Sequence, residues 1–267
     1  MGPMTASAPT TRTVEAAAAT ALQVELRAGR VELRPAPEGT TGIRGTLTGE
    51  PDVVEQIAVT TSGDTLVVEQ PAPSGWSPSE LLQRVTLSLE VPDGSRLRST
   101  TGAAELSSQV GLEAASVQTG AGEVRLARVG ELVLHAGAAD VAVEELTGPG
   151  RITTGAGAVR LGRVTGSLSA RTGAGDVEVD RLEAPLQAHT AAGSLTVRAT
   201  TASVEARTAV GTITVGVADE IPTLVDLHSG LGRVRVELPP TEPPAADDRW
   251  LRVHARSATG DILLHRA

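Results

Sequence analysis

Cysteine, lysine, asparagine, phenylalanine and tyrosine are all absent from this chain of 267 residues. Without cysteine there is no disulfide framework, no cysteine-ligated zinc and no thiol nucleophile. Without lysine there is no Schiff-base catalyst and no lysine to hold a transferring phosphoryl group. The sequence thus predicts a protein that is not an enzyme and that has neither a cofactor nor a metal site.

Aromatic residues and positive charge are also scarce. Trp76 and Trp250 are the only aromatic side chains, and the net charge is −9. Nucleic-acid binding is not expected, because it relies on cationic surfaces and stacking platforms. No apolar run approaches the roughly 18–20 residues of a membrane span, so we expect no direct membrane insertion. The first residues lack a secretory signal, which predicts a cytoplasmic protein, with envelope association as the alternative.

A short motif recurs along the chain. It begins as TGAGEVRL at Thr119 and returns as TGAGAVRL at Thr154 and as TGAGDVEV at Thr172. From the earliest copy at Thr101 to the last at Ser257, the spacings between starts are 18, 17, 18, 18, 18, 18, 21 and 28 residues. A period this regular indicates one structural unit repeated many times.

Each unit has the pattern of two short strands. In the unit from Thr154, Val159 and Leu161 alternate with polar residues, and so do Leu168 and Ala170. Such a unit cannot bury its inner face alone, so stacking predicts an all-β fold, a parallel β-solenoid (β-helix) with turns of about 18 residues. A left-handed hexapeptide helix is the alternative, although it requires an aliphatic residue every six positions.

Two further columns are expected at the corners between strands. The threonines that open the units should point inward and bond their hydroxyls to the backbone. The glycines that follow supply the backbone freedom of a tight turn. The glycines predicted to make these structural turns are Gly120, Gly122, Gly155, Gly157, Gly173 and Gly175.

The pattern also predicts how a single domain is organised along the chain. Residues 1–21 are expected to be a flexible segment, and residues 22–100 a less regular β region of irregular solenoid turns that includes a cap around Trp76. Regular repeats occupy 101–238 and a proline-rich excursion follows at 239–248. Residues 249–267 should form the final turn, a capping segment at the C-terminal end.

The repeat also carries a family resemblance. The TGAG(D/E)V units, preceded by LEVPDGSRLRSTTG at 89–102, resemble the bacterial DUF4097 family, whose members are described as adhesins or β-strand repeat proteins. The resemblance covers roughly residues 22–267. It implies a β-solenoid with a loosely defined role, sometimes at the cell envelope, and no catalytic residues to carry over.

The column immediately before the threonines should point outward. Neighbouring turns would place four basic side chains about 5 Å apart on one face, as a candidate interaction face. These residues are Arg171, His189, Arg207 and His228. An ordinary solvated strand face is the alternative interpretation.

The sequence therefore predicts a structural or interaction scaffold that is not an enzyme, with end-to-end self-assembly as one mode of action. The expected partners are another protein, a second copy of the chain, or an anionic polymer. A cell-envelope adhesin or carbohydrate-binding module is the alternative function.

Overall fold

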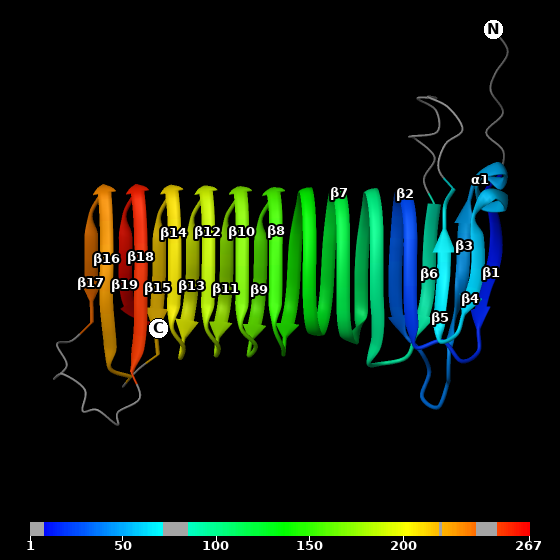
Figure 1. Ribbon diagram of the computed structural model, residues 1–267, viewed down its shortest axis with the longest axis horizontal. Coiled ribbons are helices and arrows are strands. Elements are labelled where there is room, and N and C mark those ends of the chain that lie inside the picture. Colours follow the sequence, from blue (N-terminus) through cyan, green and yellow to red (C-terminus); the bar gives the residue numbers. More distant parts are fainter. Residues whose placement is uncertain (1–7, 72–84, 219–220, 239–249) are drawn as a thin grey trace, which may run out of the picture. The chain divides into compact units, whose positions relative to one another are not determined.

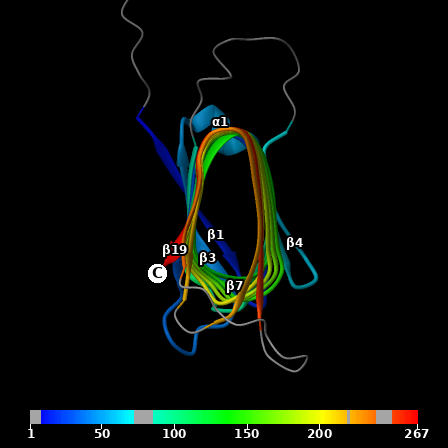
Figure 2. The same ribbon diagram turned by 90° about the vertical axis from the view of Figure 1, so that its left-hand side faces the viewer.

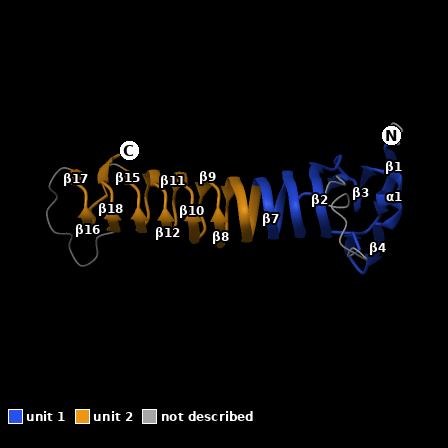
Figure 3. Cartoon of the chain, turned by 90° about the horizontal axis from the view of Figure 1, so that it is seen from above, with its two compact units in different colours: residues 1–127 blue, residues 128–267 orange. Residues whose placement is uncertain are grey.

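A computed structural model describes residues 8–71, 85–218, 221–238 and 250–267. The chain divides into two compact units, residues 1–127 and 128–267, which Figure 3 shows in blue and orange. Among the described residues, no helix is long and apolar enough to cross a membrane.

Unit 2 is a parallel β-solenoid, which confirms the predicted fold class. Each rung has two strands, and each strand pairs in parallel and in register with the equivalent strand of the next rung (Figures 1 and 2). The rungs follow the C-terminal part of β7 (Ser95–Leu146). They comprise β8 (Gly150–Ala156) with β9 (Val159–Val164), β10 (Leu168–Ala174) with β11 (Val177–Leu182), β12 (Leu186–Ala192) with β13 (Leu195–Thr200), and β14 (Val204–Val210) with β15 (Ile213–Val217).

The alternation of the repeat explains the core of this unit. In β12, Leu186 and Ala188 are buried, and in β13 so are Leu195 and Val197. The opening threonines are also buried, and most bond their hydroxyls to a main-chain carbonyl, as expected. Thr154 Oγ1, for example, donates to the carbonyl oxygen of Ala156 at 2.7 Å. These bonds satisfy polar groups that would otherwise be costly to bury.

The predicted turn glycines lie at the corners and have two different roles. Those at the fourth position of the motif adopt a left-handed backbone, with φ of +131° at Gly122, +116° at Gly157 and +145° at Gly175. Those at the second position lie against the preceding rung. A Cβ at this position would lie 2.4–2.6 Å from a carbonyl oxygen, at Gly120, Gly155 and Gly173. At these glycines a larger residue would strain the backbone or require the neighbouring rung to shift.

The last rungs are not stacked in chain order. β18 (Leu251–Thr259) and β19 (Ile262–Arg266) pair with β14 and β15 on one side. On their other side they pair with β16 (Thr223–Leu231) and β17 (Val234–Glu237). Figure 1 shows the red rung between the yellow and orange ones. The expectation that residues 249–267 form the final turn is therefore wrong, because the chain passes one rung position and returns to fill it.

Unit 1 combines parallel and antiparallel pairing. β2 (Ala21–Pro35) pairs in parallel with β5 (Thr65–Glu69), β6 (Val85–Val91) and β7. Antiparallel strands then follow on each side. β3 (Ile43–Gly49) pairs with β6, β1 (Thr10–Ala16) pairs with β3, and β4 (Ala58–Ser62) pairs with β5.

The N-terminal region of unit 1 is more ordered than the sequence predicted. Residues 1–21 were expected to be flexible, but residues 10–16 form β1, which buries Val14 and Ala16 against its neighbours. A short helix, α1 (Pro51–Gln56), packs against β1 and β3 and buries Val53 and Val54. We call α1 and the antiparallel strands β1, β3 and β4 the cap of unit 1. The cap expected around Trp76 and the excursion at 239–248 lie outside the described residues.

Candidate functional site

The outer face formed by β8, β10, β12, β14, β18 and β16 carries the predicted basic column. Register pairing aligns its members one per rung: Arg171 beside His189, His189 beside Arg207. The next neighbour of Arg207 is Arg256, and His228 follows Arg256. We call this set the basic column: Arg171, His189, Arg207, Arg256 and His228.

The structure brings the four predicted residues onto one face but changes their order. His228 was expected beside Arg207, whereas Arg256 lies between them because β18 is inserted between β14 and β16. The insertion thus places a third arginine in the middle of the column, where the sequence order would place it after His228. Five groups that are cationic or can become so therefore lie on consecutive rungs, each about 5 Å from the next.

The arginines of the basic column are only partly neutralised. Arg207 Nη2 forms an ion pair with Glu205 Oε1 at 2.8 Å. Arg171 and Arg256 are exposed and form no ion pair within the described ranges. Burial lowers the pKa of His189 below its ordinary value of 6.5, and the positive charges of Arg207 and Arg171 lower it further. His189 is therefore mainly neutral near pH 7 and becomes cationic as the solution is acidified.

The strands on the other side of the rungs, β9, β11 and β13, show the opposite arrangement. Arg163 Nε lies 3.0 Å from Glu183 Oε1, and Arg198 Nε lies 3.3 Å from Asp180 Oδ1. The hydrogen bond from Arg163 lowers the pKa of Glu183 below its ordinary value. These two arginines have acidic partners, whereas Arg171 and Arg256 of the basic column have none within the described residues.

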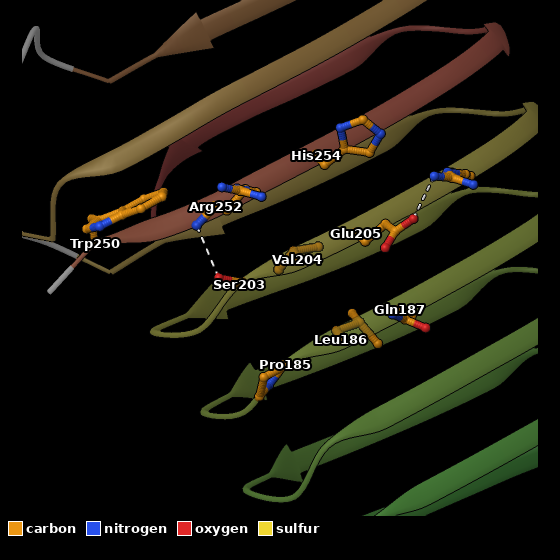
Figure 4. Close-up of a pocket in the computed structure, with 10 residues that line it drawn as sticks. Pro185, Leu186, Gln187, Ser203, Val204, Glu205, Trp250, Arg252 and His254 are labelled. Carbon is orange, nitrogen blue, oxygen red and sulfur yellow. Dashed lines mark hydrogen bonds and ion pairs between the residues drawn. The ribbon is translucent and has the colours of Figure 1, made fainter.

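A shallow groove of about 610 Å³ runs beside the basic column (Figure 4). Trp250 lies at one end of it and is 40% exposed. The Arg252 guanidinium lies 5.5 Å from the centre of the Trp250 ring, within the range of a cation–π contact. The main-chain amide of Arg252 donates to Ser203 Oγ at 3.2 Å, which ties this end of β18 to the start of β14.

The lining of the groove combines an apolar floor with polar walls. Leu186 and Val204 are buried beneath it. The polar residues that line it are Gln187, Ser203, Glu205, Arg207, Arg252 and His254. A second hollow of about 440 Å³ adjoins the groove, since both include Pro185 and Gln187. A surface that extends across several rungs fits an elongated ligand better than a compact one.

The groove was not predicted from the sequence, although Trp250 was noted as an unusual side chain. Its neighbours depend on the insertion of β18 beside β14, which the local pattern does not show. The two irregular spacings, 21 and 28 residues, were the available signal that the chain leaves its regular course. No cluster of three or more potential metal-ligating side chains occurs in the parts of the chain that the structure describes.

Comparison with solved structures supports the fold. A protein described as a putative adhesin from Bacteroides fragilis aligns with a TM-score of 0.50 at 14% identity, over 96% of this chain and 97% of that one. Another, from Parabacteroides merdae, aligns with a TM-score of 0.44 at 12% identity, over 96% and 95% of the two chains. At these identities the first likeness shows the fold alone.

Comparison of sequences identifies the family. No curated protein matches the chain. The family model described as Toastrack DUF4097 matches residues 20–234, which include the regular repeats and most of unit 1. The chain therefore belongs to the Toastrack DUF4097 family.

Proposed function

We propose that this protein is an interaction scaffold without catalytic activity, and that its partner docks along the basic column. The observation that carries the proposal is the register that places Arg171, His189, Arg207, Arg256 and His228 on consecutive rungs. A rigid row of basic side chains at a fixed spacing of about 5 Å, three of them arginines, suits a partner with regularly spaced anionic groups. An anionic polymer is the ligand chemistry that this arrangement fits best.

The charge distribution supports this assignment. The protein is acidic as a whole, so an anionic partner is repelled from most of its surface. Arg171 and Arg256 have no acidic partner among the described residues, whereas Arg163 and Arg198 on the other side of the rungs do. Attraction is therefore local, and we expect binding to weaken steeply with salt.

Binding to a defined polyanion tests the proposal. The double variant R171E/R256E should lower the affinity for polyglutamate or dextran sulfate by about tenfold or more, measured by titration calorimetry at low salt. The matched control is R160E/R181E, which makes the same change in net charge on β9 and β11. Equal losses in both variants would show a nonspecific effect of charge and would contradict the docking site.

The groove favours a second candidate function, that of a carbohydrate-binding adhesin at the cell envelope. An exposed tryptophan beside polar side chains provides a stacking surface and hydrogen-bonding groups for a sugar. The likeness to proteins described as adhesins agrees with this role. W250A should then abolish binding to glycans on an array, while R171E/R256E should leave it unchanged.

A further inference from the structure

The rung formed by β16 and β17 has neighbours on one side only. β18 pairs with β16 and β19 pairs with β17. No other described strand pairs with either of them. We call the opposite side the outer edge of unit 2. Its free main-chain N–H and C=O groups can pair with a further strand.

The inward-facing side chains of β17 are exposed, unlike those of β19 in the neighbouring rung, and the inward-facing Val225 and Leu227 of β16 are half-buried. Val234 and Val236 are 45% and 47% exposed. Ile262 and Leu264 occupy the same positions of the next rung and are 1% and 0% exposed. A further rung paired with this edge would cover Val234 and Val236 and remove their apolar surface from water. Leu224 and Leu231 of β16 are also exposed, but they lie in outward columns, beside Arg252 and Thr259.

The order of charges along β16 and β17 is self-complementary. If β16 pairs antiparallel with β16 of a second copy and Leu227 lies opposite Leu227, then Asp226 lies opposite His228 in both directions. If β17 pairs in the same way about Val236, then Arg235 lies opposite Glu237 in both directions. The Arg235–Glu237 pairs bring opposite charges face to face across the strands, which stabilises the pairing. Asp226 also lies 2.8 Å from His254 Nδ1 of its own chain.

One two-fold axis can serve both strands. Leu227 precedes Leu231 by four residues, and Val236 follows Gly232 by four residues. The two strands run in opposite directions from the turn between Leu231 and Gly232, so Leu227 and Val236 lie at the same level of the rung. A two-fold axis that passes beside Leu227 and Val236 relates the two copies. It places β16 antiparallel to β16 of the second copy and β17 antiparallel to β17 of the second copy.

We propose that the outer edge of unit 2 binds the same edge of a second copy of this chain, with β16 and β17 each pairing antiparallel with their counterparts. The interface is isologous, so each copy uses the only such edge among its described residues and the assembly stops at a dimer. Unit 1 offers no comparable surface, since none of its described large hydrophobic residues is exposed. The dimer therefore replaces the open filament that end-to-end stacking would give. The dimer shares His228 with the basic column, but it does not depend on what binds there.

Light scattering after size exclusion, over a range of concentrations, tests the proposal. The wild-type protein should reach twice the 27.2 kDa of one chain and grow no further. R235E places two acidic groups opposite each other and should raise the dimer dissociation constant by about tenfold or more. The double exchange R235E/E237R restores opposite charges and should restore the dimer, which a merely destabilised edge would not do.

Two valine variants separate the edge from general surface effects. V236D should give a monomer. V210D makes the same change at an exposed valine of β14, away from the outer edge, and should leave the dimer intact. A wild-type monomer at every concentration, growth beyond two copies, or a failure of R235E/E237R to restore the dimer would overturn the proposal. Polyanion binding by a monomeric variant would show that the function proposed for the basic column stands apart from this result.

Discussion

The two units end their sheets in different ways. In unit 1 the parallel pairing of β2, β5 and β6 gives way to antiparallel strands, and α1 buries Val53 and Val54. In unit 2 the parallel pairing continues unchanged to β16 and β17, where Val234 and Val236 remain exposed. The first unit thus closes its core with strands of another direction, while the second presents an unfinished rung.

The difference shows that a repeat buries the core between rungs but leaves the core of its last rung uncovered. Stacking buries the inner face of each rung only if another rung follows. A terminal rung therefore needs either a cap or a partner, and a strand edge without either is a site of association. Unit 1 has the features of a cap, and unit 2 has the features of an interface.

The largest expected effect comes from truncating the same repeat position in an inner rung and in the outer rung. Ile213 is 0% exposed, whereas Val234, at the same position of the rung, is 45% exposed. Ile213→Ala should lower the free energy of unfolding by about 3 kcal/mol, because it leaves a cavity. Val234→Ala should cost the monomer less than about 0.5 kcal/mol. Urea unfolding at low protein concentration measures both, and equal costs would contradict the open edge.

A smaller effect is expected at the cap of unit 1. Val54 is 1% exposed, so Val54→Ala should lower the free energy of unfolding by about 2 kcal/mol through lost burial and a small cavity. Val210→Ala makes the same change at a side chain that is 57% exposed and should have almost no effect. If the two variants unfold at the same denaturant concentration, α1 does not close the core of unit 1.

The smallest effect concerns pH and the basic column. Because the pKa of His189 is lowered in the folded protein, the unfolded chain takes up the proton more readily, and stability falls as the pH drops below 6.5. H189Q removes this loss, so it should gain stability relative to wild type at about pH 5 compared with about pH 7.5. Thermal unfolding at the two pH values measures the difference. A difference that stays constant with pH would contradict the lowered pKa.

Much of unit 2 could be predicted from the sequence because its contacts repeat. Alternation at Leu186 and Ala188 fixes which side chains point inward, and the 18-residue period fixes which residues align between rungs. The buried threonines and the outward position of Arg171, His189 and Arg207 follow from the same pattern.

The remaining features depend on contacts that no local pattern records. The position of β18 beside β14 is chosen by packing, and it decides that Arg256 lies between Arg207 and His228 and that Trp250 borders the groove. The antiparallel pairing of β1 with β3 likewise joins segments whose own sequences do not specify strand direction. The sequence therefore predicts the structure of each rung more fully than the order in which the rungs stack.

Hydrogen–deuterium exchange at low and high protein concentration most directly tests the contrast between the cap of unit 1 and the outer edge of unit 2. The account predicts that amides of 223–237 gain protection as concentration rises, because β16 and β17 become paired on their outer edge. Amides of β1 and β4 should exchange equally at both concentrations. Added protection in β1 or β4, or none in 223–237, would contradict the assignment of the cap to unit 1 and of the interface to unit 2.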